Sequence, residues 1–409
     1  MTTFDPAAAT AAYLAELSPA AHAKAVAYTQ GGHWLLLWGW LVTIVASWLI
    51  IRSGILAKTG QGIERRKPHP VIVSFVLSLI YLVADWVLEL PWASYSEWWR
   101  EKQYGLSNQT WLGWFADDAK TTLVVLIVVA LFLAGIYALI RHAGRAWPVW
   151  AGLLTGAFLV FTAWAQPVVL DPLLNTYEAA PPGAVRDTVV ALGHATGVPT
   201  DKIYVFNGSK QSNRYTANVA GMFGTARVAL SDSMFAKGAD IAQIRGVVGH
   251  EMGHYVHQHA LWDAAASAIL VMLGAWLLQA LFPLASTLFG AGGLGGLSDP
   301  AGLPVLMAIF ATLSLLATPI NNTISRLAEA DADSFSLAHA GEPDGLSEAL
   351  VKTIEYRASS PSDLEEVLFY DHPSVEHRVR KAMDWKAAHM PAATAPAVAA
   401  SSAPTPAGH

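Results

Sequence analysis

Two histidines and a glutamate lie together at His250, Glu251 and His254, in the pattern H-E-x-x-H. Residues 240–262 around them are patterned as a helix, in which side chains four positions apart lie on one face. The rings of His250 and His254 can therefore reach one metal ion, while Glu251 is placed to act on a metal-bound water. The spacing predicts a zinc site of the peptidase type.

A hydrolytic zinc site usually has a third protein ligand. In one arrangement this ligand is a histidine six residues after the second, but His257 stands where that pattern has glycine, and Ala260 where it has histidine. In the other arrangement it is a glutamate on a later helix, and Glu329 in S-R-L-A-E-A-D-A-D is the candidate. Asp333 shares its helical face and can support a ligating histidine, whereas Asp331 is expected to be a solvent-facing charge.

The composition predicts a membrane protein. Of the 409 residues, 54% are hydrophobic and only 14% are charged, against about a quarter charged in soluble domains. There is no cysteine, so disulfides are excluded and any metal must bind histidine and carboxylate side chains. The formal net charge of −6 gives no reason to expect nucleic-acid binding.

Six stretches approach the ~20 apolar residues that a membrane span needs. An even number of spans places both termini and all the candidate chemistry on one side. The expected fold is a mainly α polytopic membrane protein of about six transmembrane helices, with a small α/β domain on one side. The predicted spans are residues 33–51, 71–90, 121–140, 147–164, 260–284 and 301–320.

The chain is divided by composition into six parts. They are an Ala-rich start (1–32), a four-helix membrane region (33–167), a catalytic zinc domain with an edge strand and the H-E-x-x-H helix (168–259), two further spans (260–320), the C-terminal part of the catalytic domain with the third ligand (321–388), and a disordered tail (389–409). Within these parts, periodicity predicts helices at 183–197, 322–340, 345–357 and 374–388 and strands at 202–206, 215–220 and 226–230.

Three further blocks carry a family resemblance. They are E-K-Q-Y-G-L-S-N-Q-T from Glu101, D-P-L-L-N from Asp171, and D-H-P-S from Asp371 followed by Arg378. With H-E-x-G-H and S-R-x-x-E-x-x-A-D, they make residues 71–386 resemble the integral-membrane zinc metallopeptidases of the CAAX prenyl-protease type. The resemblance implies that the six helices form a chamber and that the α/β domain is a gluzincin-like catalytic domain. The sequence departs from that family in having one span fewer than the eukaryotic members, and an extra His257.

The resemblance implies one Zn²⁺ per chain, bound by His250, His254 and Glu329. Glu251 would take the proton of the metal-bound water and pass it to the leaving amine. The substrate would be a peptide or protein at the lipid bilayer, cleaved near its C-terminus, and either lipidated, as prenylated or CAAX-like proteins are, or unmodified.

Further roles follow from the same resemblance. His372 would donate to the oxyanion, with Arg378 as support. An edge strand containing Ala217, Asn218 and Val219 would hold the substrate by strand addition, with the Asn218 side chain on the substrate backbone.

Several alternatives stay open at this point. Glu329 could form only a surface ion pair with Arg326, and His372 could only cap a helix. His257 and His259 are expected to be solvated or to support the metal ligands. The protein could also be a broader quality-control metalloprotease of membrane proteins, or a transporter or scaffold with a structural zinc site. The last two would keep their activity after Glu251→Gln.

Two signals disagree on which side of the membrane the zinc site faces. The short loops opposite the candidate chemistry contain several lysines and arginines, which favours an external zinc side. The resemblance favours a cytoplasmic zinc side in a bacterial inner membrane, and long domains cross membranes regardless of charge. We expect the cytoplasmic arrangement.

Overall fold

A computed structural model describes residues 4–66, 69–214, 216–236, 238, 240–353 and 357–389. The predicted disordered tail falls outside the described residues from 390 onward, and so does Tyr215, the first residue of one predicted strand.

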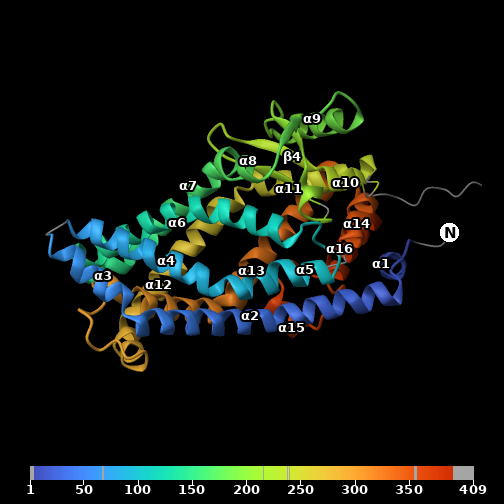
Figure 1. The fold of residues 1–409 in the computed structure, drawn as a ribbon. Coiled ribbons are helices and arrows are strands. Elements are labelled where there is room, and N and C mark those ends of the chain that lie inside the picture. Colours follow the sequence, from blue (N-terminus) through green and yellow to red (C-terminus); the bar gives the residue numbers. More distant parts are fainter. Residues whose placement is uncertain are drawn as a thin grey trace, which may run out of the picture.

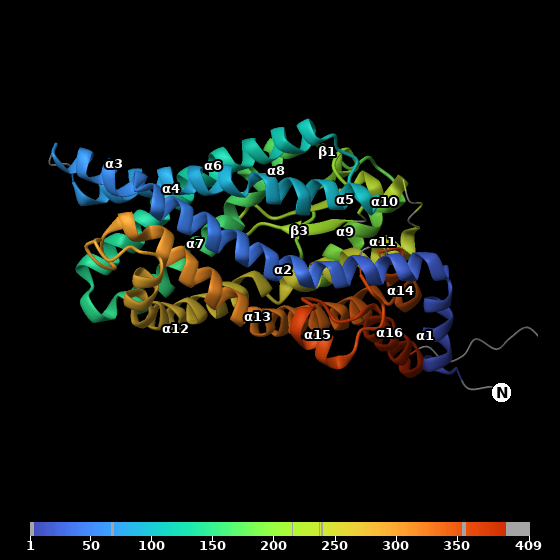
Figure 2. The same ribbon diagram turned by 60° about the horizontal axis from the view of Figure 1, so that its bottom comes forward.

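In the part of the chain that the structure describes, six helices are long and apolar enough to cross a membrane, and each contains one of the six predicted spans. They run side by side from the end that carries α3 (Ile55–Glu64) toward the end with the sheet (Figures 1 and 2). The helices are α2 (Pro19–Ser53), α4 (Pro70–Ala93) with η1 (Ser94–Trp99) and α5 (Arg100–Gln103), α6 (Trp111–His142), α7 (Trp147–Val169) with α8 (Asp171–Leu174), α12 (His259–Leu288) and α13 (Leu303–Ala340). The predicted fold class is therefore confirmed.

Three helix boundaries differ from the prediction. The helix predicted over 345–357 is α14 (Pro343–Lys352), which ends at Lys352, and residues 354–356 lie outside the described residues. The last span and the helix that carries Glu329 form one helix, α13, which continues through Pro319. The polar residues after position 320 mark where this helix leaves the apolar layer, and the helix itself continues. Conversely, the single helix predicted over 240–262 is broken into α11 (Ile241–Val256) and α12 at Gln258, whose φ is 56°. The left-handed backbone of Gln258 cannot continue a right-handed helix.

A four-stranded sheet of order β1-β2-β4-β3 lies beside α11. Strands β2 and β4 are parallel and the other pairs are antiparallel, so β3 is an edge strand. The three predicted strands are present, and β1 was not predicted. Their bounds are β1 (Tyr177–Ala179), β2 (Ile203–Phe206), β3 (Ala217–Ala220) and β4 (Arg227–Ser231).

Short helices complete the part of the chain outside the spans. Three of them, α1, α14 and α16, lie together at one end of the molecule (Figures 1 and 2). The N-terminal α1 is tied to α14 by the Tyr13 hydroxyl, which donates to Asp344 at 2.8 Å. The short helices are α1 (Pro6–Ala15), α9 (Ala184–Thr196), α10 (Asp232–Ala236), α14 (Pro343–Lys352), α15 (Asp363–Phe369) and α16 (Val375–His389).

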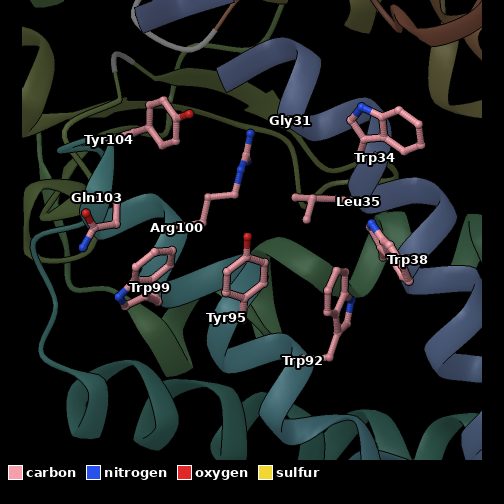
Figure 3. Close-up of a pocket in the computed structure, with 10 residues that line it drawn as sticks. All are labelled: Gly31, Trp34, Leu35, Trp38, Trp92, Tyr95, Trp99, Arg100, Gln103 and Tyr104. Carbon is pink, nitrogen blue, oxygen red and sulfur yellow. The ribbon is translucent and has the colours of Figure 1, made fainter. Parts of the chain in front are cut away.

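A cavity of about 820 Å³ opens between α2 and the π-helical turn that follows α4. Figure 3 shows indole and phenol rings on both of its sides, with the Arg100 side chain reaching in from one end. Aromatic rings of this kind are typical of the membrane–water interface. The lining residues are Gly31, Trp34, Leu35, Trp38, Trp92, Tyr95, Trp99, Arg100, Gln103 and Tyr104.

Candidate active site

Glycines on one face of α11 let this helix lie against its neighbours. A Cβ on Gly249 would stand 2.9 Å from the Ser336 hydroxyl oxygen, and one on Gly253 would stand 3.0 Å from the Ala332 Cα. Both of these neighbours belong to α13. Because the two helices approach so closely, side chains of α11 and α13 meet over a short distance.

His250, His254 and Glu329 meet at this contact. The Nε2 atoms of the two histidines are 3.1 Å apart. Glu329 places Oε2 3.2 Å from His250 Nε2 and Oε1 3.4 Å from His254 Nε2. Three ligands bound to zinc at ~2.0–2.1 Å in tetrahedral geometry would have donor atoms ~3.3 Å apart, so the three residues fit a metal ion of this kind.

An unsatisfied oxygen also fits a metal here. Glu329 is buried, and its Oε2 atom makes no hydrogen bond among the described residues. A buried carboxylate oxygen without a partner is costly, and a bound cation would satisfy it. The alternative in which Glu329 only pairs with Arg326 is not what the structure shows, because Arg326 donates instead to the Glu366 and Tyr370 carbonyl groups.

Asp333 and Arg378 support His250 from behind. Asp333 Oδ1 lies 2.9 Å from His250 Nδ1, which directs the Nε2 atom of the ring toward Glu329. Arg378 holds both Asp333 oxygens, with Nε 2.8 Å from Oδ2 and Nη2 2.7 Å from Oδ1. Its Nη1 is 3.7 Å from Glu329. The Arg378 guanidinium group therefore pairs with the Asp333 carboxylate, which in turn orients His250.

Glu251 lies within the same electrostatic environment. Burial raises the pKa of its carboxyl group, and the nearby His250 and His254 oppose this only in part. A carboxyl group with a raised pKa accepts a proton more readily than an ordinary glutamate, as a general base requires.

His372 reaches the site from the loop between α15 and α16. Its Nε2 lies 3.2 Å from Glu329 Oε1, and its Nδ1 lies 2.8 Å from Asp371 Oδ1. Burial lowers the pKa of His372, but the contacts with Asp371 and Glu329 outweigh it and leave the pKa above its ordinary value. A histidine that carries a proton at Nε2 can serve as a donor beside the metal group.

Sequence reasoning missed how this loop is held. The Arg326 guanidinium donates to the Tyr370 carbonyl at 2.5 Å, directly before Asp371 and His372. Arg326 lies one helical turn before Glu329 on α13, so the same helix fixes both the third candidate ligand and the His372 loop. The S-R-x-x-E spacing was the available signal.

The predicted edge strand packs against α11. Ala217 and Val219 turn toward the hydrophobic core that includes Met252 of α11, and the intervening Asn218 points to the opposite face of the sheet. The buried Asn218 Oδ1 atom has no hydrogen-bond partner among the described residues.

Two of the motif blocks tie the sheet to the membrane helices. The first block pairs with the segment before β3, where Asn108 donates to the Ser209 carbonyl at 2.7 Å. The second begins with Asp171, which accepts a hydrogen bond from the buried Arg227 of β4 at 2.5 Å. The first block thus positions the segment before β3, the second positions β4, and neither contributes a residue to the group of His250, His254 and Glu329.

Next to the metal group lies a second cluster that sequence reasoning did not foresee. Asp331 is partly exposed, as expected, but its Oδ2 atom contacts His257 Nδ1 and lies 3.2 Å from His259 Nε2. His259 also lies against His254, with their Nδ1 atoms 2.9 Å apart.

Comparison with known families assigns the chain. Residues 180–386 match the profile of peptidase family M48, and residues 6–176 match that of the CAAX prenyl protease N-terminal region with five membrane helices. The chain belongs to peptidase family M48. It is thus a membrane metalloprotease, which decides against a transporter or a scaffold. In this N-terminal region the structure has four candidate spans among the described residues, one fewer than the family description.

Individual relatives agree with this assignment. The chain is 28% identical to "Uncharacterized metalloprotease YhfN" of Bacillus subtilis, over 90% of this chain and 86% of that one. It is 27% identical to a CAAX prenyl protease 1 homolog of Arabidopsis thaliana, over 82% of this chain and 78% of the other. The crystal structure of S. mikatae Ste24p superposes with a TM-score of 0.73 at 19% identity, covering 90% of each chain, which shows the same fold.

Proposed function

We propose that His250, His254 and Glu329 bind one Zn²⁺ and that the protein is a zinc metalloendopeptidase. The observation that carries this proposal is the convergence of one ligand atom each from His250, His254 and Glu329 within 4.8 Å, with Glu329 Oε2 making no hydrogen bond among the described residues. A bound zinc ion would activate water and polarise the scissile carbonyl group. Membership of a metallopeptidase family implies a metal, and the absence of cysteine limits its ligands to these residue types.

The residues around the ligands take separate roles. Glu251 accepts a proton from the attacking water and gives it to the leaving amine. His372 donates from Nε2 to the oxyanion of the tetrahedral intermediate. Asp333 fixes the tautomer and the orientation of His250, and Arg378 holds Asp333 in place, as their contacts at 2.7 to 2.9 Å favour.

The peptide substrate would extend β3 as an additional strand. Main-chain hydrogen bonds to residues 217–219 would hold an extended segment beside α11. The unpartnered Asn218 Oδ1 would then accept a hydrogen bond from a substrate amide.

The substrate is proposed to be a membrane-associated protein cleaved near its C-terminus, with a lipid group accommodated between the spans. The aromatic cavity of Figure 3 supports this, because most of its lining residues are aromatic and it lies between α2 and the end of α4. Its Arg100 donates to the Tyr28 carbonyl, and the Tyr28 hydroxyl accepts from Arg214 at 2.9 Å, shortly before β3. These contacts connect the cavity to the proposed peptide-binding strand.

For location, we propose a bacterial inner membrane with the zinc side in the cytoplasm. A reporter fused after His409 tests the sidedness, and a reporter active only in the periplasm would overturn it.

Glu251→Gln is the direct test of the mechanism. This variant should keep zinc at His250, His254 and Glu329 and fail to cleave peptides, because it keeps the ligands but loses the base. Cleavage that persists in the variant would refute the proposal. Comparing a farnesylated C-terminal peptide with its unmodified form and with an unfolded membrane protein then assigns the substrate class. Preference for the unfolded protein would indicate a broader quality-control protease.

A further inference from the structure

A second group of potential metal ligands lies on the solvent side of the proposed zinc site. It consists of His257, His259 and Asp331, which offer one ligand atom each within 4.8 Å of one another. Asp331 Oδ2 is the shared point of contact, since it touches His257 Nδ1 and lies 3.2 Å from His259 Nε2. None of these three residues belongs to the first ligand set.

The backbone between the two histidines is arranged for this convergence. In a continuous helix, side chains two positions apart point in nearly opposite directions, at 100° per residue. Gln258 stands between them with φ 56° and ψ 38°, which ends α11 and turns the chain into α12. This left-handed conformation costs a non-glycine residue about 1–2 kcal/mol. The break brings both rings to one carboxylate of α13.

The donor set and its surroundings suit a divalent cation. Two imidazole nitrogens and one carboxylate oxygen are ligands of Zn²⁺ and of neighbouring transition metals, with further positions open to water. The side chains of His257 and Asp331 are 40% and 47% exposed, so an ion can exchange with solvent.

We propose that His257, His259 and Asp331 form a second, exchangeable divalent-metal site whose occupancy inhibits the protease. The inhibitory part rests on the proposed function; metal binding does not.

Inhibition follows from the contact between His259 and His254. With His254 bound to the first metal through Nε2, its Nδ1–H group donates to His259 Nδ1 across 2.9 Å. His259 then carries its own proton on Nε2, facing Asp331. A metal at His259 Nε2 requires the other neutral tautomer, with the proton on Nδ1. Two N–H groups would then face each other, and His254 would lose the acceptor that orients it.

The test measures metal stoichiometry and inhibition on the full-length protein in detergent. Wild-type protein titrated with Zn²⁺ should bind two equivalents, one tight and one weak, and the weak one should slow peptide cleavage. His257→Ala removes a ligand that does not contact the first metal group, so it should weaken the second equivalent at least ~100-fold, abolish inhibition by added zinc and leave basal cleavage unchanged. Asp331→Asn should likewise lose the second equivalent. His194→Ala, at an exposed histidine of α9, is the matched control and should behave as wild type.

Each outcome decides the proposal. If the wild type binds only one equivalent of Zn²⁺, the proposal is wrong, whether or not the protein cleaves peptides. It is also wrong if both His257→Ala and Asp331→Asn still bind two equivalents. If Asp331→Asn lowers peptide cleavage while the number of bound zinc equivalents is unchanged, His259 and Asp331 only orient His254. Two equivalents without zinc inhibition would remove the inhibitory role. If the wild type cleaves no peptide, the proposed function is wrong, but the number of bound zinc equivalents can still be measured.

Discussion

Asp333→Asn should weaken both the zinc site and the fold, although the side chain keeps its shape. Asp333 accepts from three donors, His250 Nδ1 and two nitrogens of Arg378, at 2.7 to 2.9 Å. Asparagine has one oxygen. If this oxygen serves His250, the amide nitrogen faces Arg378 Nε across about the same distance, donor against donor. The Arg378 side chain, which is 7% exposed, also loses the charge that balances it.

The magnitudes follow from these contacts. Breaking one partner of a buried ion pair costs about 3–5 kcal/mol of stability. Loss of a hydrogen bond behind a metal-ligating histidine typically weakens metal affinity ~10–100-fold. The assays are the unfolding temperature in detergent and competition for zinc with a chromophoric chelator. Asp384→Asn is the control, because Asp384 pairs with Arg380 on the exposed face of α16 and should change stability by less than ~1 kcal/mol.

A double variant separates charge balance from ligand orientation. Asp333→Leu with Arg378→Met removes both buried charges, so stability should recover relative to Asp333→Asn. Zinc affinity should stay low, because His250 still lacks its acceptor. If the chelator-competition curve of Asp333→Asn overlays that of the wild type, the proposed role of Asp333 is wrong.

Three further predictions concern the contact of α11 with α13 and the metal itself. Gly253→Ala places a Cβ 3.0 Å from the Ala332 Cα, so it should lower the free energy of unfolding by about 1–3 kcal/mol and weaken zinc binding. The control is Gly274→Ala, whose Cβ meets nothing within 4 Å and should change neither quantity. Equal chelator-competition curves for the two variants would contradict this. Arg326→Met should free the loop that carries His372 and lower kcat about 10–100-fold with zinc content unchanged, and a change in KM alone would refute that. Chelation should lower the unfolding temperature, since zinc at 100 times its Kd stabilises the fold by about 2.7 kcal/mol.

The sequence predicted the elements whose signal is local. The six spans follow from apolar runs, and three of the four strands, β2, β3 and β4, follow from short apolar segments, whereas β1 was not predicted. The pairing of His250 and His254 follows from helical spacing, and the structure brings Glu329 to them as expected. Whether these residues hold zinc, and whether His372 and Asn218 act as proposed, are still predictions for the experiments above.

What could not be predicted depends on tertiary contacts. Gln258 carries no local signal for a left-handed backbone, so the break between α11 and α12 was not anticipated. The contact of Asp331 with His257 and His259 exists only because that break faces α13. The role of Arg326 likewise depends on a loop some 40 residues further along the chain, whose position no periodicity encodes.

Because α13 is one continuous helix, bilayer thickness affects the position of Glu329. A single 38-residue helix, about 57 Å long at 1.5 Å per residue, spans the apolar layer and then carries Glu329. Spanning helices adjust their tilt to hydrocarbon thickness. Because the helix acts as a lever, a tilt of about 3° about its far end displaces Glu329 by about 2 Å, which is comparable to a metal–ligand bond. Catalytic rate in bilayers of graded acyl-chain length should therefore peak at one thickness, and a flat response would show that the lever is uncoupled.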